Sequence, residues 1–170
     1  MRDIIRYIDT NQHSKLWRLL GAEGGLPIDS PMSQIGGMTA LMHMAAVSGS
    51  TIMTQMLERN PNLGKRDSTG RTALHYACRA GNHKTVRILL GVCPAELREQ
   101  PTNGGITPLM SAVQSGDITV VQLCLQAGCD PSAVDMLGQN VLFYARAFKD
   151  VDGVNMSHII QKAIDERAAA

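Results

Sequence analysis

The sequence predicts an all-α protein, an α-solenoid of helix–turn–helix units joined by β-hairpin or loop connections. A Gly-x-Thr-like segment recurs four times in the 170 residues, and its glycines, Gly37, Gly70, Gly105 and Gly138, lie 33, 35 and 33 residues apart. Apolar residues follow these segments at helical spacing, and aromatic residues make up only 4% of a chain that contains ten Met. Self-similarity at this period is typical of stacked repeats, and small aliphatic side chains with Met suit a helical core.

Each recurring segment contains the start signal of a helix. Thr39, Thr72 and Thr107 follow the glycines by two residues, where a hydroxyl can accept hydrogen bonds from the free N–H groups of a first helical turn. Pro108 comes next in one unit, at a position where its missing N–H costs nothing. A first helix is therefore expected after each Thr. Gly116 is one of the residues expected to end such a helix, because glycine adopts positive φ without steric cost.

A second helix is expected directly after the first. Its apolar positions recur at helical spacing and define one buried face. They are Val86, Leu89 and Leu90 in one unit, and Val120, Val121, Cys124 and Leu125 in the next. A stripe of Met156, Ile159, Ile160, Ala163 and Ile164 predicts a last helix that closes the stack.

Two segments carry a family resemblance. Thr72-Ala73-Leu74-His75-Tyr76-Ala77, followed by Gly81-Asn82-His83, resembles the Thr-Pro-Leu-His-x-Ala…Gly-His signature of ankyrin repeats, and Gly105 to Asp130 is similar to that consensus almost throughout. The resemblance implies one ankyrin-repeat domain over 1–170. Its repeats are expected at 34–66, 67–101 and 102–134, between an N-terminal capping unit at 1–33 and a C-terminal capping unit at 135–170.

Some positions depart from the family pattern. Met42 and Met110 stand where the motif has the histidine that His75 keeps, so the hydrogen bonds of that histidine to neighbouring backbone are expected to be lost in two units. Extra residues between Ala95 and Gln100 lengthen one loop, which is expected to bulge or to add a helical turn. Neither change is expected to alter the fold.

The composition and charge of the chain exclude several functional classes. Apolar residues make up 44% of the chain, which is too many for a disordered tail, and the net charge of +1 lacks the basic excess typical of nucleic-acid-binding proteins. Met1 to Tyr7 contains no apolar core of about 7–15 residues, so no signal peptide is expected, and no run of about 18 apolar residues predicts a membrane span. We therefore expect no nucleic-acid or membrane partner, and a reducing compartment, the cytosol or the nucleus.

No set of residues with catalytic spacing is found in the sequence. His75 and His83 fall on polar positions of the family motif and are expected to be structural, and no histidine pair has the spacing of a helical zinc site. Cys78 and Cys124 are expected in the core. Cys93 and Cys129 are expected in or near loops as partly exposed thiols, which leaves a nucleophilic cysteine as a weaker alternative. We expect no enzymatic activity, no metal and no cofactor.

The family resemblance also indicates where a partner would bind. In ankyrin repeats, the positions that flank the motif glycine and those just before the turn between the helices commonly contact partners, on a concave face. Carried over to this chain, the expected contact residues are Ile35, Met38, Val47, Arg71, Arg79, Ile106, Gln114, Leu137 and Gln139. The apolar members are expected to be exposed, and exposed apolar surface often marks a partner site. Met136 and Leu137 could instead pack on a neighbouring hairpin.

The function expected from these features is protein binding by a monomeric adaptor or scaffold. Three alternatives remain open. The chain could be a small ankyrin-type inhibitor that blocks an enzyme such as a kinase, although only similarity of fold supports that reading. It could use its apolar face to associate with itself as a structural protein. It could also be a catalytic protein that uses Cys93 or Cys129.

Overall fold

The computed structural model describes residues 28–31, 36–47, 50–146 and 155–169. These residues form the predicted all-α solenoid of stacked helical units. The described part contains helices and two isolated β-bridges, Pro31 with Thr39 and Val134 with Asn140, and no extended strand. Most of the N-terminal capping unit expected at 1–33 lies outside the described residues, as does Ile35.

Each described unit contributes a first and a second helix. The first helices are α3 (Ala40–Val47), α5 (Ala73–Arg79), α8 (Pro108–Ser115) and α10 (Val141–Ala145). The second helices are α4 (Ser50–Leu57), α6 (His83–Val92), α9 (Ile118–Gln126) and α11 (Met156–Ala168). A short helix, α7 (Ala95–Arg98), lies in the lengthened loop, so the additional helical turn expected there is confirmed.

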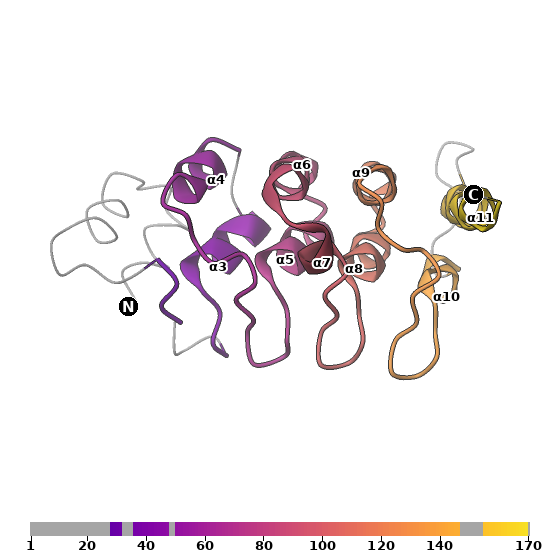
Figure 1. The fold of residues 1–170 in the computed structure, drawn as a ribbon, viewed down its shortest axis with the longest axis horizontal. Coiled ribbons are helices and arrows are strands. Elements are labelled where there is room, and N and C mark those ends of the chain that lie inside the picture. Colours follow the sequence, from indigo (N-terminus) through magenta and orange to yellow (C-terminus); the bar gives the residue numbers. More distant parts are fainter. Residues whose placement is uncertain (1–27, 32–35, 48–49, 147–154, 170) are drawn as a thin grey trace, which may run out of the picture.

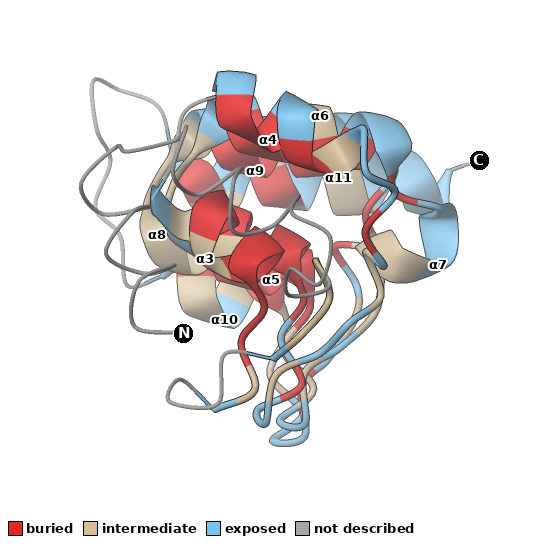
Figure 2. Ribbon diagram, turned by 90° about the vertical axis from the view of Figure 1, so that its left-hand side faces the viewer, coloured by how far each residue is buried: buried red, intermediate tan, exposed pale blue. Residues whose placement is uncertain are grey.

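The helices form two rows, and the hairpins that connect successive units project from one side of them (Figure 1). The first helices form one row and the second helices the other. The end-on view in Figure 2 shows buried residues concentrated where the rows face each other, while the hairpin tips are largely exposed. The core therefore runs along the axis of the stack. The surface formed by the hairpins and the first helices is the concave face of a solenoid of this kind.

Methionine supplies much of the core in the second unit. Met42, Met44, Met53 and Met56 are all fully buried there, and Met110 occupies a similar position in the fourth unit. Met is unbranched and flexible, so it fills irregular gaps between helices. The scarcity of aromatic residues is compatible with this core, because close-packed helices leave little space for large rings.

The predicted caps and stops are present at the helix ends. The Thr107 hydroxyl accepts from the Met110 N–H at 3.3 Å, and Pro108 occupies the first turn of α8. Gly116 ends α8 with φ of 77°, a left-handed conformation that favours glycine. The Asp117 carboxylate then caps α9 by accepting from the N–H of Thr119 at 2.8 Å. The local sequence thus sets both ends of the turn between the two helices.

The histidine position of the motif is used in two different ways. In the third unit, His75 Nδ1 accepts from the Thr72 N–H at 3.1 Å, and His75 Nε2 lies 3.0 Å from the carbonyl oxygen of Ile106 in the next unit. The sulfur atoms of Met42 and Met110 accept from the N–H of Thr39 and Thr107 at 3.4 and 3.5 Å. The expectation that the bonds would be lost was therefore wrong for the bond within the unit, because a thioether is a weak acceptor. A thioether has no proton to donate, so Met cannot reproduce the bond to the next unit.

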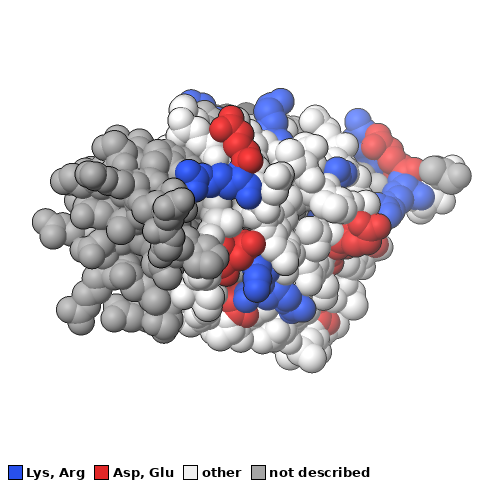
Figure 3. Space-filling view, turned by 60° about the vertical axis from the view of Figure 1, so that its left-hand side comes forward, with Lys and Arg blue, Asp and Glu red and all other residues white. Residues whose placement is uncertain are grey.

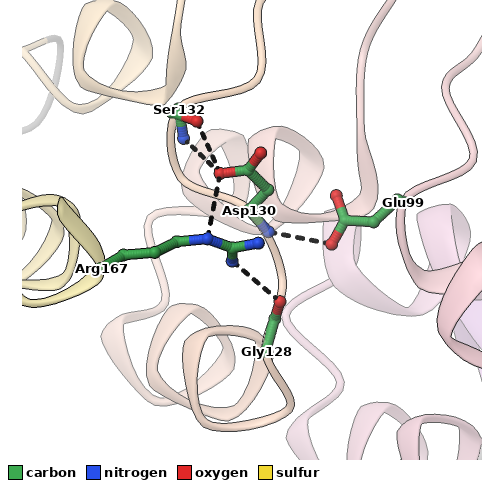
Figure 4. Close-up of polar contacts among 5 residues, drawn as sticks. All are labelled: Glu99, Gly128, Asp130, Ser132 and Arg167. Carbon is green, nitrogen blue, oxygen red and sulfur yellow. Dashed lines mark hydrogen bonds and ion pairs between the residues drawn. The ribbon is translucent and has the colours of Figure 1, made fainter. Parts of the chain in front are cut away.

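Polar contacts tie the last helix to the two preceding units (Figure 4). Arg167 on α11 lies 3.9 Å from the Asp130 carboxylate and donates to the carbonyl oxygen of Gly128 at 3.3 Å. The Asp130 N–H in turn donates to the Glu99 carboxylate at 2.9 Å. Met156 and Ile160 of α11 are buried, so the predicted last helix packs on the stack through its apolar stripe. Among the described helices, none is long and apolar enough to cross a membrane.

Candidate partner-binding face

The hairpins of neighbouring units are joined by backbone hydrogen bonds at equivalent positions. Ser68 N–H donates to Gly36 O at 2.7 Å, Asn103 N–H to Thr69 O at 2.9 Å, and Met136 N–H to Gly104 O at 3.1 Å. One bond at each junction fixes the spacing of adjacent tips. The row of hairpins is therefore a continuous ridge, held by backbone atoms, along one edge of the concave face.

An Asp–Tyr pair organises the hairpin of the third unit. Asp67 Oδ1 accepts from the backbone N–H groups of Thr69 and Arg71, each at 2.8 Å, and Asp67 Oδ2 accepts from the Tyr76 phenol at 2.6 Å. Although partial burial opposes it, these hydrogen bonds hold the pKa of Asp67 below its usual value. Burial and the adjacent carboxylate raise the pKa of Tyr76 to about 12.

The same pair recurs in the fifth unit. Asp135 Oδ1 accepts from the N–H groups of Leu137 and Gln139 at 2.8 and 2.9 Å, and the Tyr144 phenol donates to Asp135 Oδ2. The phenol contact is the largest influence on Asp135, and it lowers the pKa of that carboxyl. The two hairpins therefore share one internal arrangement of acid and phenol.

The hairpin between them, in the fourth unit, lacks this pair. Thr102 stands at the position of the acid and Ser111 at the position of the tyrosine. The Thr102 hydroxyl still accepts from the Ile106 N–H at 3.1 Å, which reproduces one bond of the acid. Neither replacement carries a negative charge or an aromatic ring. Space is therefore left beside this hairpin that a phenol fills in the other two.

A pocket of about 600 Å³ lies at this place, between the hairpins of the third and fourth units and the helices α5 and α8. Hydroxyl, amide and guanidinium groups line it, together with one apolar side chain. The lining residues are Ser68, Thr69, Arg71, Arg79, Thr102, Asn103, Gly104, Ile106, Ser111 and Gln114. None of them is a carboxylate. The pocket is therefore positively charged and rich in hydrogen-bonding groups.

Four of the nine predicted contact residues come together in this pocket. They are Arg71, Arg79, Ile106 and Gln114. The Arg79 guanidinium donates to the Gln114 amide oxygen, so two of the four are directly connected across the unit boundary. Ile106 and Gln114 are half-buried, whereas both arginines are exposed. Four residues predicted to contact a partner therefore line a single pocket.

Three of the remaining predicted residues lie elsewhere on the described surface. Val47, at the end of α3, is 56% exposed, and Leu137, at the tip of the last hairpin, is 79% exposed. Met136, beside Leu137, is 77% exposed, so neither of these two side chains packs on a neighbouring hairpin as the alternative had it. Gln139 is half-buried. Apolar side chains therefore do face solvent on the hairpin side, although they are widely separated.

The expectation that Met38 is exposed was wrong, because its side chain is only 8% exposed and belongs to the hydrophobic core. Arg71 occupies the equivalent position in the third unit and is exposed, whereas Ile106 in the fourth unit packs partly on the core. The position thus sits at the margin of the core. An apolar side chain turns inward there because burial removes its surface from water, and a guanidinium stays outside.

Thr102 and Ser111 are the pocket residues that reasoning from the family pattern missed. Both line the pocket, and neither is a position at which the family commonly contacts partners. These two residues can be found in the sequence by comparing the units with one another. Asp67 and Asp135 occupy the same position in two units, and Tyr76 and Tyr144 do so nine residues later. The second unit has Gln34 and His43 there and the fourth has Thr102 and Ser111, so the pair distinguishes the third and fifth units from the other two.

Charges of both signs are mixed on the face shown in Figure 3. Lys and Arg side chains there alternate with Asp and Glu, and uncharged residues cover most of the described surface in that view. A second hollow, of about 560 Å³, lies between α9 and α11 on the side of the second helices, and Lys162, Glu166 and Arg167 give its rim both signs. The pocket beside α8 differs from it in having cations and no acid.

The four thiols are all buried, so the expected partial exposure of Cys93 and Cys129 was wrong. Cys93 ends α6 with its side chain directed into the core, and burial raises its pKa to about 11. Cys78 and Cys124 lie in the core as predicted, with their sulfur atoms 3.7 Å apart. In the described part of the chain no three His, Cys, Asp or Glu side chains are close enough together to hold a metal ion.

Comparison with known proteins identifies the repeat. The family model described as "Ankyrin repeats (3 copies)" matches residues 6–100, and the model described as "Ankyrin repeat" matches residues 104–136. The matched ranges contain the units that supply both sides of the pocket. They also extend N-terminally beyond the described residues.

Relatives come from several kinds of larger protein. Neurogenic locus notch homolog protein 1 of Mus musculus is 32% identical over 116 residues, which cover 68% of this chain and 4% of that protein. The phosphocholine transferase AnkX of Legionella pneumophila is 27% identical over 123 residues, 71% of this chain and 13% of that protein. An ADP-ribosylation factor GTPase-activating protein of Arabidopsis thaliana is 34% identical over 100 residues, 57% of this chain and 12% of that protein. The chain thus spans only a small part of each of these relatives. It belongs to the ankyrin-repeat family, whose repeats are general modules of protein–protein interaction.

Proposed function

We propose that this chain is a non-catalytic adaptor or scaffold module that binds a partner protein on its concave face. The observation that carries this proposal is the pocket beside α8, which brings together Arg71, Arg79, Ile106 and Gln114 from two units. Arginine is enriched among the residues that contribute most to binding at protein interfaces. A monomer that presents this pocket needs no partner copy to complete it.

The exposed apolar side chains support the same face. Val47, Met136 and Leu137 are exposed on the first-helix and hairpin side of the stack. A protein partner that lies along the concave face could cover these side chains and reach the pocket between them. Binding of nucleic acid is not favoured, because the net charge is +1 and the visible charges are mixed.

Affinity capture from lysate of the source cells tests the proposal with two charge-matched variants. The first carries Arg71→Glu, Arg79→Glu and Leu137→Glu on the concave side. The second carries Lys84→Glu, Arg87→Glu and Val92→Glu on the outer helix α6, where all three residues are exposed. Each variant reverses two positive charges and places one acid at an exposed apolar position. Circular dichroism checks that both remain folded.

The proposal expects proteins captured by the parent to be retained by the outer-helix variant and lost by the concave-side variant. Loss by the outer-helix variant alone would place the interaction on the other row of helices and contradict the proposal. An assay of any captured enzyme with and without added protein then separates a scaffold from an inhibitor. A scaffold leaves the activity unchanged, and an inhibitor lowers it.

A further inference from the structure

The pocket beside α8 has features that select a particular chemical group. It carries the guanidinium groups of Arg71 and Arg79, and among the described residues neither arginine forms an ion pair with a carboxylate. Arg71 lies beside the Tyr76 phenol, and Arg79 donates to Gln114. Both arginines are exposed, so their charges remain available to a ligand that enters from solvent.

The hydrogen-bonding groups around the arginines are mostly hydroxyls. Ser68, Thr102 and Ser111 contribute them from the two hairpins and from α8. The Thr69 hydroxyl also lines the pocket, but it donates to the Asp67 carboxylate at 2.7 Å. Asn103 is already committed to the fold, because its amide group donates to Ser68 O at 3.0 Å and its amide oxygen accepts from Arg66. Hydroxyl donors next to guanidinium groups favour an anionic oxygen ligand over an apolar one.

The absence of the Asp–Tyr pair from the fourth unit leaves this pocket without an internal acid. In the third and fifth units a carboxylate accepts from a phenol at the equivalent position, which adds a negative charge and fills the space with a ring. Thr102 and Ser111 remove both features. The pocket beside this unit therefore contains neither an internal carboxylate nor an aromatic ring.

We propose that this pocket binds the carboxylate side chain of an extended acidic segment in the partner protein. The pocket volume of about 600 Å³ falls within the ~300–1,000 Å³ of typical ligand sites, so it can hold a short stretch of peptide as well as the acidic group. The fork of N–H groups on Arg71 can bind a carboxylate in bidentate fashion. Arg79 and Gln114 can bond to the peptide backbone, and Ile106 offers apolar contact.

A carboxylate fits the pocket better than a phosphate group does. A phosphorylated side chain carries a charge of about −1.5 to −2 at neutral pH and is typically bound by a cluster of arginines. Here the Arg79 guanidinium, one of the two in the pocket, already donates a hydrogen bond to Gln114. A single bidentate arginine suffices for one carboxylate. This inference rests on the proposed function, because it names the partner chemistry of the same face.

The test uses the full chain and an array of short synthetic peptides. The central residue of each peptide is Glu, Gln, phosphoserine or Lys, and the flanking positions are randomised. A charge-assisted hydrogen bond that replaces a neutral one predicts that Glu peptides bind about tenfold more tightly than Gln peptides. Lack of a Glu preference in the parent overturns the inference. A stronger preference for phosphoserine than for Glu overturns it in favour of a phosphate site.

The decisive variant, here termed the filled variant, combines Thr102→Asp with Ser111→Tyr. It installs in the fourth unit the pair that the third and fifth units already carry, so it is compatible with the fold of these repeats. The variant is expected to abolish the Glu preference, because it fills the pocket and adds a competing carboxylate. Arg71→Gln is expected to abolish it too, whereas Arg87→Gln on α6 is expected to retain it. Retention of the preference by the filled variant contradicts the inference.

The filled variant also separates this inference from the proposed function. If it still captures partners that the concave-side variant loses, the concave face binds proteins and the carboxylate pocket is wrong. If the filled variant and the concave-side variant both lose the partners, and the Glu preference disappears as well, both the face and its ligand chemistry are supported. If partners are lost only by the outer-helix variant, the proposed function itself fails.

Discussion

The Nε2 atom of His75 lies 3.0 Å from the carbonyl oxygen of Ile106, 31 residues further along the chain. The Thr72 N–H can only donate, so His75 Nδ1 accepts from it and the ring proton is on Nε2. The imidazole is therefore neutral and donates to the next unit. Since Ile106 lines the carboxylate pocket, this bond also holds one wall of the pocket in place.

The first prediction concerns the pH dependence of stability. Burial lowers the pKa of His75 to about 4, from an ordinary value of 6.5, because the charged ring is poorly solvated in the core. Between these values the unfolded chain binds more protons than the folded one. The contribution of neutral His75 to the free energy of unfolding is therefore fully present above pH 6.5. It declines as the pH falls toward 4, by about 3 kcal/mol at most. Urea unfolding at a series of pH values measures the decline.

His75→Met is the matched control for that series. Met42 and Met110 occupy the equivalent position in neighbouring units, so a thioether is compatible with this site. At neutral pH the free energy of unfolding of the variant is expected to be lower by about 1–3 kcal/mol, because the Ile106 carbonyl loses its hydrogen-bond donor. The difference between parent and variant should shrink as the pH falls below 6.5. A constant difference across this range would show that His75 does not titrate as predicted.

Much of this fold could be predicted from the sequence because the repeat uses the same local signals each time. Thr107, Pro108 and Gly116 specify a helix start and stop through their own backbone chemistry, so their roles do not depend on distant residues. The direction of the Met38 side chain was missed because that position lies at the margin of the core. Whether such a side chain turns inward depends on packing against the next unit, which a local pattern does not encode.

The site was only partly predictable for a related reason. The family pattern identifies positions that commonly contact partners, and two of those positions, Arg71 and Gln114, line one pocket in the structure. It does not weigh Thr102 in the hairpin or Ser111 on α8, which together create the space. A pocket arises from the absence of a side chain, and an absence shows in a sequence only when equivalent units are compared with one another.

A second prediction follows from the Asp67–Tyr76 hydrogen bond. Tyr76→Phe removes the phenol that donates to Asp67 Oδ2 at 2.6 Å, so the pKa of Asp67 should rise toward its ordinary value. The variant should also lose about 1 kcal/mol of unfolding free energy near neutral pH. Because the folded pKa of Asp67 is lowered, its stabilisation is present above the unfolded pKa and disappears as the pH falls through the folded one. NMR titration of the Asp67 carboxyl carbon measures the pKa directly.

Tyr144→Phe provides the comparison for that measurement. It removes the equivalent phenol from Asp135 in the fifth unit and leaves Asp67 untouched. The pKa of Asp135 should then rise while that of Asp67 stays constant. An Asp67 carboxyl that titrates identically in the parent and in Tyr76→Phe would mean that the backbone N–H groups of Thr69 and Arg71 alone set its pKa.

A third prediction uses three glycines of the hairpins to separate the cost of backbone strain at positive φ from the cost of a steric clash with the next hairpin. A Cβ on Gly105 would lie 2.6 Å from Met136 N and 2.8 Å from Asp135 Cα, and Gly105 has φ of 82°. Gly138 has φ of 73°, but a Cβ added there would meet no atom within 4 Å, and a Cβ on Gly104 would meet only the Thr102 hydroxyl at 3.9 Å. Alanine at Gly104 should therefore leave the free energy of unfolding nearly unchanged. Alanine at Gly138 should lower it by about 1 kcal/mol through backbone strain, and alanine at Gly105 should lower it several times more.

Thermal or urea unfolding of the three alanine variants gives the order of stability. The order Gly104→Ala, then Gly138→Ala, then Gly105→Ala, from most to least stable, would support the close approach of the fourth and fifth hairpins. Equal losses at Gly105 and Gly138 would show that this approach relaxes at little cost. The carboxylate pocket depends on the analogous spacing between the third and fourth hairpins, so the result also bears on its rigidity.

The last prediction concerns the four thiols and the reading of the chain as a catalyst. Burial raises the pKa of Cys93 to about 11, and contact with Cys124 together with burial raises the pKa of Cys129 well above its ordinary value. The thiolate is the reactive species, so both residues should react slowly with iodoacetamide near neutral pH in the native protein. In denaturant all four thiols should react at the rate of a free cysteine, which gives the internal standard. Rapid labelling of a single native cysteine would contradict the buried assignment and revive the catalytic alternative. Uniformly slow labelling would exclude Cys93 and Cys129 as nucleophiles and leave binding on the concave face as the function to pursue.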